Sequence, residues 1–118
     1  MYDHIGFKVK DIEASVRFYK AALSALGLAL CSREERAASF GPAGAPGLYL
    51  SIGAPSPAMH VAFKAPDRAA VDRFYKDGLR AGGSDNGGPG LRADYSPTYY
   101  AAFLLDPDGN NIEAVCLR

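Results

Sequence analysis

Hydrophobic residues recur along this chain with two different periods. Near the N-terminus, Ile5, Phe7 and Val9 alternate with other side chains, which is the pattern of a strand with one buried face. Over residues 11–26 the apolar positions instead recur every three or four residues, as they do on one face of a helix. The aspartate that opens this stretch can cap the helix, and Gly27 can end it. We therefore predict a strand followed by an amphipathic helix.

The same pattern returns 56 residues later. Residues 4–27, HIGFKVKDIEASVRFYKAALSALG, are echoed by HVAFKAPDRAAVDRFYKDGLRAGG at residues 60–83. A repeat of this length indicates two copies of one structural unit. In the second copy we expect Val61 and Phe63 to face the core, and Asp67 to cap the helix.

The chain should return as strands after each helix. In the first copy the candidate strands are residues 28–33, 37–40 and 48–52. In the second copy a glycine-rich passage, 82–90, precedes candidate strands at 99–105 and 111–117, which a tight Asp-Pro-Asp-Gly turn joins. Each half thus has the order βαβββ. We predict an α+β fold in one domain, residues 1–118, with module one at 1–54 and module two at 57–118.

Composition and charge exclude several classes of partner. The chain has 118 residues, and its 13 basic and 13 acidic side chains give a net charge of zero and a pI near 6.7. This balance provides no long-range attraction to nucleic acid or to an anionic membrane. No apolar run approaches the roughly 20 residues of a membrane span, and the N-terminus lacks the pattern of a signal peptide. We expect a cytoplasmic protein that binds a small molecule.

Candidate chemistry begins with the histidines, because the chain has two and the repeat places them at the same position of its two copies. A pseudo-twofold stacking of the halves would direct His4 and His60 toward one cavity. Glu113, on the last strand, points away from its apolar neighbours and can face that cavity. Two imidazoles and one carboxylate are a common set for a divalent metal, with positions left for water or substrate.

Each residue of this set also has a purely structural interpretation. A single histidine is more often a surface or core residue than a metal ligand. A glutamate in an apolar strand can mark an exposed edge. The occurrence of both histidines at repeat-equivalent positions favours the metal site.

The sequence also resembles a known superfamily. The doubled βαβββ unit, the histidine that opens each half, and the closing FLLDPDGNNIEAV at residues 103–115 resemble the vicinal oxygen chelate superfamily. That group includes glyoxalase I, fosfomycin-resistance enzymes, methylmalonyl-CoA epimerase, extradiol dioxygenases and bleomycin-resistance proteins. The resemblance covers nearly the whole chain and implies a cup-shaped, curved mixed sheet. It also implies that His4, His60 and Glu113 fall on the metal-ligand positions.

Three positions depart from particular members of the superfamily. Alignment of GLYLS with NIEAV places Tyr49 where glyoxalase I and the epimerase add a fourth ligand, and a phenol with a pKa near 10 is a poor ligand and base. Phe103 stands where the ring-cleaving dioxygenases have a tyrosine, and Gly6 where the fosfomycin transferases have a threonine. Bleomycin-binding proteins lack the metal set, which this chain retains.

We hypothesise a glyoxalase-type enzyme of the lyase or isomerase kind. One divalent ion, Zn²⁺, Ni²⁺, Mn²⁺ or Fe²⁺, would bind two neighbouring oxygens of a small substrate and stabilise an enolate or oxyanion. The candidate catalytic residues are Glu113 and Tyr49. Residues 87–98 form a loop that could close over an anionic ligand. The candidate substrate contacts are Arg92, Tyr95, Tyr100 and Phe103.

Two alternatives remain for the function. The first is a non-catalytic module that binds or sequesters a small molecule or drug, because the sequence places no carboxylate other than Glu113 in the cavity. The second is an extradiol-type dioxygenase, whose metal set has the same composition. In each case the sheet edges of the two modules favour a homodimer.

Overall fold

The computed structural model describes residues 1–54 and 57–118, and it has the predicted βαβββ order in its first half. The elements of module one are β1 (Ile5–Val9), α1 (Ile12–Ser24), β2 (Ala29–Glu34), β3 (Ala37–Gly41) and β4 (Leu48–Ile52). Asp11 caps α1 as predicted, because its side chain accepts a hydrogen bond from the Ala14 amide at 3.2 Å.

Module two repeats this order with one difference. Its elements are β5 (His60–Lys64), α2 (Arg68–Arg80), β6 (Ser84–Asp85), β7 (Gly90–Leu91), β8 (Tyr100–Leu105) and β9 (Asn111–Cys116). The glycine-rich passage forms two strands of two residues each instead of one long strand. Between them the backbone of Gly87 has φ +137°, a conformation outside the strand region.

The strands form two separate mixed sheets within one chain. The first has the order β1-β4-β3-β2, and the second has the order β5-β9-β8-β6 with β7 paired to β8. In each sheet the first strand of the module runs parallel to the last one, β1 to β4 and β5 to β9. Consequently β1 and β5 are edge strands. The α+β class and the paired modules predicted from the sequence are confirmed.

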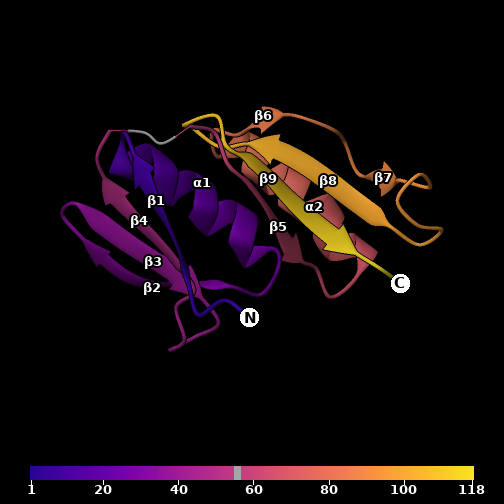
Figure 1. The fold of residues 1–118 in the computed structure, drawn as a ribbon, viewed down its shortest axis with the longest axis horizontal. Coiled ribbons are helices and arrows are strands. Elements are labelled where there is room, and N and C mark those ends of the chain that lie inside the picture. Colours follow the sequence, from indigo (N-terminus) through magenta and orange to yellow (C-terminus); the bar gives the residue numbers. More distant parts are fainter. Residues whose placement is uncertain (55–56) are drawn as a thin grey trace.

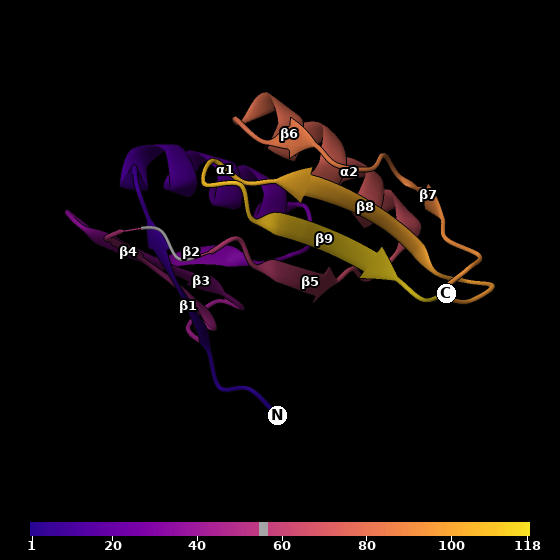
Figure 2. The same ribbon diagram turned by 45° about the horizontal axis from the view of Figure 1, so that its top comes forward.

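The two helices lie against each other on one side of the sheets (Figures 1 and 2). Gly83, just after α2, permits this contact, because a Cβ atom there would lie 2.4 Å from Phe18 Cε1 of α1. The opposite face of each sheet, called the open face below, is not covered by a helix. The modules therefore meet through their helices.

A buried polar network also joins the modules. The Tyr19 hydroxyl of α1 donates to Asp106 Oδ2 at 2.5 Å, and both residues are almost fully buried. Asp106 lies in the turn between β8 and β9, where it also accepts hydrogen bonds from Asp108 and Asn110. The predicted Asp-Pro-Asp-Gly hairpin is therefore attached to the helix of the other module.

This network predicts a specific loss of stability in alkali. Burial, followed by the negative charge of Asp106 and its hydrogen bond, raises the pKa of Tyr19 well above its ordinary value of 10. Folding therefore favours the protonated phenol, and its contribution is complete below pH 10 and is lost as pH rises through the folded pKa. Above pH 10 the free energy of unfolding should therefore fall with rising pH. In Tyr19→Phe this fall should be less steep than in the parent, by about 1.4 kcal/mol per pH unit. Urea unfolding from pH 8 to 11 measures this slope, with exposed Tyr2→Phe as control; equal slopes in both variants would contradict it.

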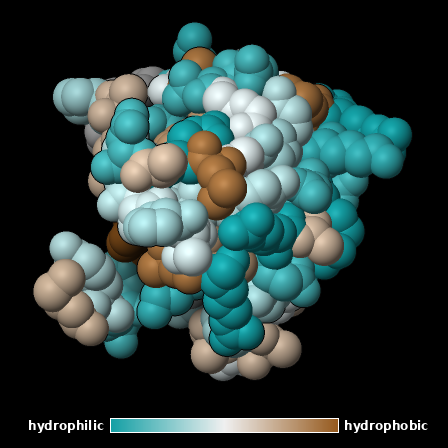
Figure 3. All heavy atoms as spheres, turned by 90° about the vertical axis from the view of Figure 1, so that its right-hand side faces the viewer, coloured by the Kyte–Doolittle hydropathy of each residue, from teal (hydrophilic) through white to brown (hydrophobic). Residues whose placement is uncertain are grey.

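The surface is mainly polar where the β7 loop and the C-terminus lie. Figure 3 shows hydrophilic and neutral atoms over most of this face, with hydrophobic atoms in small separate spots. Among the described residues, no helix combines the length and apolar character that crossing a membrane requires.

Candidate functional site

The open face of module two carries the chemistry predicted from the sequence. Strand pairing sets Ala62, Glu113 and Phe103 side by side across β5, β9 and β8, and His60 lies at the start of β5 beside Asn111. Ile112 and Leu104 point to the opposite face and pack in the core. Glu113 is 2% exposed although no helix covers it, because neighbouring side chains enclose its carboxylate.

His60 and Glu113 form a close pair. Nε2 of His60 lies 3.1 Å from Oε1 of Glu113, and Nδ1 of His60 lies 3.0 Å from the backbone oxygen of Asn111. Since a carbonyl oxygen only accepts, we assign the ring proton to Nδ1. In a neutral imidazole Nε2 is then an acceptor, and it faces an acceptor oxygen of the carboxylate. Two acceptors at this separation are satisfied either by a proton that they share, as in an imidazolium–carboxylate pair, or by a metal ion between them.

The second oxygen of this carboxylate makes a contact that the sequence pattern did not predict. The Tyr99 hydroxyl donates a hydrogen bond to Glu113 Oε2. Burial, followed by this bond and the charge of Glu113, raises the pKa of Tyr99 to about 12. Counting back from Phe103 could have predicted the face on which Tyr99 lies, because Tyr99 is an even number of residues away and so points the same way.

Aromatic and cationic groups line one side of the pair. The Phe103 ring stacks on the His60 imidazole with centroids 6.4 Å apart, and the Arg92 guanidinium lies 5.4 Å from the Phe103 centroid. Arg92 donates to the backbone oxygens of Gly88 and Gly90 at 2.7 and 2.8 Å. Two of its N–H groups are thus used within the loop, and the rest of the guanidinium is available to an anion.

An unsatisfied acceptor also lies beside the pair. Asn111 Oδ1 is buried and has no hydrogen-bond partner among the described residues. Asn111 pairs with His60 across β5 and β9, and it precedes Glu113 by two positions on the same face of β9. A donor such as a water molecule or a ligand group could satisfy it.

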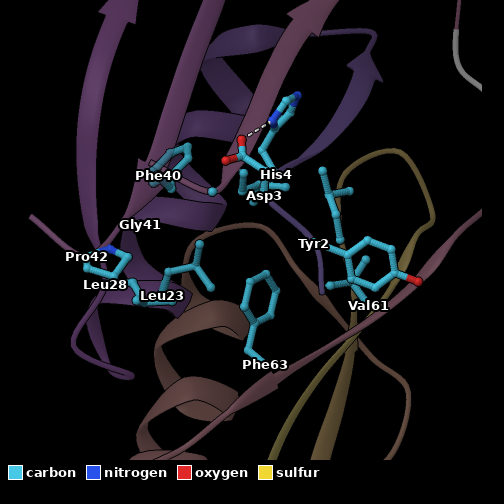
Figure 4. A pocket seen from close by; sticks show the side chains of 13 residues that line it. Tyr2, Asp3, His4, Leu23, Leu28, Phe40, Gly41, Pro42, Val61 and Phe63 are labelled. Carbon is cyan, nitrogen blue, oxygen red and sulfur yellow. Dashed lines mark hydrogen bonds and ion pairs between the residues drawn. The ribbon is translucent and has the colours of Figure 1, made fainter. Parts of the chain in front are cut away.

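His4 lies on module one, just before β1. Asp3 Oδ1 is 2.6 Å from its Nδ1, and the ring meets Tyr49 edge-on with centroids 5.2 Å apart. Figure 4 shows this histidine at the rim of a largely apolar cavity of about 280 Å³, which Val61 and Phe63 also line. Because Asp3 holds Nδ1, Nε2 is left as the available nitrogen.

The other predicted substrate contacts are divided between the two faces of module two. Tyr95 is exposed and packs edge-on against Tyr99 at 5.0 Å. Tyr100 differs from the expectation: its hydroxyl donates to Asp72 of α2 at 2.6 Å, so it lies on the helix side of the sheet. The reason is strand alternation, which directs the neighbouring side chains of Tyr99 and Tyr100 to opposite faces.

The donor set fits a metal ion in part. Two ligand atoms that share one metal at about 2.1 Å are about 3 Å apart, which agrees with the His60–Glu113 pair. In both histidines Nδ1 contacts an acceptor, the arrangement that orients Nε2 of metal-bound histidines. Within residues 1–54 and 57–118 of one chain, however, no three His, Cys, Asp or Glu side chains come close enough to hold a metal. One chain therefore supplies two donors together and a third, His4, elsewhere.

Comparisons with known proteins agree with this architecture. The model of the Glyoxalase/Bleomycin resistance protein/Dioxygenase superfamily matches residues 2–114. A glyoxalase/bleomycin resistance protein from Albidiferax ferrireducens T118 is 28% identical, with 98% of this chain and 97% of that chain covered and a TM-score of 0.83.

Two further solved structures share the fold at lower identity. A glyoxalase/bleomycin resistance protein/dioxygenase family enzyme from Burkholderia phytofirmans PsJN is 18% identical, with 98% of each chain covered and a TM-score of 0.75. A glyoxalase-related enzyme from Fulvimarina pelagi is 21% identical, with 94% of this chain and 84% of that chain covered and a TM-score of 0.72. No curated protein matches the chain. On the family match, the chain belongs to the Glyoxalase/Bleomycin resistance protein/Dioxygenase superfamily.

Proposed function

We propose that this protein is a divalent-metal-dependent enzyme whose site two copies of the chain complete. The observation that carries the proposal is the pair of acceptors, His60 Nε2 and Glu113 Oε1, at 3.1 Å. A metal ion between the two atoms would satisfy both acceptors, and the enclosed carboxylate and the oriented imidazole are the donor types that Zn²⁺, Ni²⁺, Mn²⁺ and Fe²⁺ accept. The third donor is His4 of a second copy.

The arrangement of the modules supports a site shared between chains. The helices meet inside one chain, and within residues 1–54 and 57–118 His4 does not join His60 and Glu113 in a group that could hold a metal. Among the described residues, β1 and β5 each pair with a strand on one side alone, and free strand edges favour association with another chain. A twofold axis would set β1 of one copy beside β5 of the other. His4 of one copy would then approach His60 and Glu113 of the other.

The residues around the pair support a small, oxygen-rich substrate. A bound metal would supply Lewis-acid stabilisation to an enolate or oxyanion formed on two neighbouring substrate oxygens. Phe103 provides a flat apolar wall beside His60, and Arg92 provides a cation near the same ring. Tyr49, which is 42% exposed on the open face of module one, could donate a hydrogen bond to the substrate. The reaction proposed is of the lyase or isomerase type.

A second candidate function is small-molecule binding without turnover. It is favoured by Tyr49, which occupies the position where a second carboxylate would act as base. The 280 Å³ cavity near His4 also has a mainly apolar lining, including Leu23, Phe40 and Phe63. Such a cavity suits a neutral or apolar ligand better than a reactive centre.

Metal content tests the proposal directly. Protein purified without a histidine tag and loaded with Zn²⁺ should keep about one ion per chain after desalting, and His60→Ala should keep less than about one tenth of that. Lys64→Ala, on the same strand and open face, should keep the parent content. Acetohydroxamate, which chelates through two neighbouring oxygens, should raise the melting temperature of the loaded protein and leave that of the metal-free protein unchanged. If the parent protein retains no metal, the proposal of a metal-dependent enzyme is wrong, and small-molecule binding without turnover is the function that stands.

A further inference from the structure

Tyr99 and Tyr100 provide a natural comparison on adjacent positions. Each phenol donates to one carboxylate, Tyr99 to Glu113 on the open face and Tyr100 to Asp72 on the helix side. The two side chains are of the same type and lie next to each other in the sequence, but they face different surroundings. Any role that Tyr99 has beyond folding must therefore come from its contact with Glu113.

The contact divides the two oxygens of Glu113 between different tasks. Oε1 faces His60 Nε2 at 3.1 Å, and Oε2 accepts the hydrogen bond of the Tyr99 hydroxyl. A carboxylate with one oxygen held by a donor is directed to bind a cation through the other oxygen. A free carboxylate can instead take two coordination positions by binding through both.

The loop before β8 fixes the position of this hydroxyl. The Arg92 amide donates to the backbone oxygen of Tyr99 at 2.7 Å, the Tyr95 amide donates to the backbone oxygen of Arg92 at 2.9 Å, and Tyr95 packs edge-on against the Tyr99 ring. Thr98 Oγ1 donates to the Leu117 backbone oxygen at 2.9 Å. The backbone of Tyr99 is thus bonded within the loop, its neighbour Thr98 is bonded to the C-terminal segment, and Tyr95 packs on its ring. These contacts limit the directions that the phenol can take before any metal binds.

We propose that Tyr99 is a positioning residue that makes Glu113 a one-oxygen metal ligand. This inference rests on the proposed metal site and adds a purpose to it. With Glu113 bound through Oε1 alone, the three protein ligands occupy three positions, and at least two remain for neighbouring substrate oxygens. A Glu113 bound through both oxygens would take one of these positions. Tyr99 would therefore keep the site open to a chelating substrate.

Cobalt binding tests this role without reference to activity. Co²⁺ is added to parent, Tyr99→Phe and Tyr100→Phe protein, with affinity measured against a competing chelator and coordination read from the visible absorption spectrum. Tyr99→Phe should lower the affinity about ten- to one hundred-fold. Its spectrum should weaken toward that of a higher coordination number, because Glu113 is free to bind through both oxygens. Tyr100→Phe should match the parent in both measurements.

The outcomes separate the two proposals. If the parent binds Co²⁺ and Tyr99→Phe has the same affinity and spectrum, the positioning role is wrong and the metal site stands. If both tyrosine variants lose affinity equally, the effect is structural and the positioning role is again wrong. If the parent binds no Co²⁺, the proposed function fails and this inference fails with it.

Discussion

Mixed dimers of a His4→Ala chain and a His60→Ala chain should regain metal binding that neither variant has alone. In the proposed dimer each site takes His4 from one copy and the His60–Glu113 pair from the other. A mixed dimer therefore contains one site with all three ligands and one site that lacks both histidines. Its metal content should be about half that of the parent dimer, because one of the two symmetric sites is intact. To prepare the mixed dimer, the two chains carry different tags and are coexpressed. The dimer is purified through both tags, and the tags are then removed.

A second mixture provides the matched control. His60→Ala and Glu113→Ala remove ligands from the same half of the site, so every site in their mixed dimer lacks one member of the pair. This mixture should bind no more metal than either variant alone. Recovery in the first mixture but not the second identifies a site shared between chains. No recovery in either, with a parent that binds metal, would contradict the shared site and assign His4 to its own chain.

The repeat made most of the fold predictable. The two-residue and three- to four-residue periods located both modules, and the aspartates at the starts of the helices serve as the caps that were expected. Two-residue strands β6 and β7 were not predicted, because their pairing depends on contact with β8 and glycine-rich sequence carries no periodicity. The association of the modules through α1 and α2 was also beyond the sequence pattern. It depends on the close approach of Gly83 to Phe18 of α1, which periodicity does not reveal.

The candidate site could be predicted in part, because some of its residues are placed by the periodicity of a single strand. Strand alternation directed His60 and Glu113 away from the core, and both lie on the open face of module two, because side-chain direction in a strand follows from local register. The position of His4 relative to that pair depends on how whole modules are arranged, and a repeat is compatible with several arrangements. Tyr100 was assigned by residue type without counting its register. The same count would have selected Tyr99 instead.

Asp106→Ala should be among the most destabilising single substitutions in the chain. Asp106 is 4% exposed and accepts hydrogen bonds from the Tyr19 hydroxyl, the Asp108 amide, and both the amide and the side chain of Asn110. Removal of the carboxylate leaves these buried donors without their acceptor, which should lower the free energy of unfolding by about 3 to 5 kcal/mol. Urea unfolding at pH 7 measures the loss. Asp108→Ala, in the same turn but only half-buried, should lose about 1 kcal/mol.

The same substitution should also weaken the proposed metal site, because the turn leads directly into it. Asn110 Oδ1 accepts a hydrogen bond from the Met59 amide at 2.9 Å, so Asp106 and Asn110 together hold the residue before His60 as well as the strand that carries Glu113. Asp106→Asn keeps the shape of the side chain but turns one acceptor into a donor, and we expect it to fall between parent and alanine variant in both stability and metal affinity. Stability that falls while metal affinity stays at the parent value would show that the turn supports the fold without orienting the ligands. A parallel fall in both would mean that the buried network joining the two modules also sets the distance between His60 and Glu113.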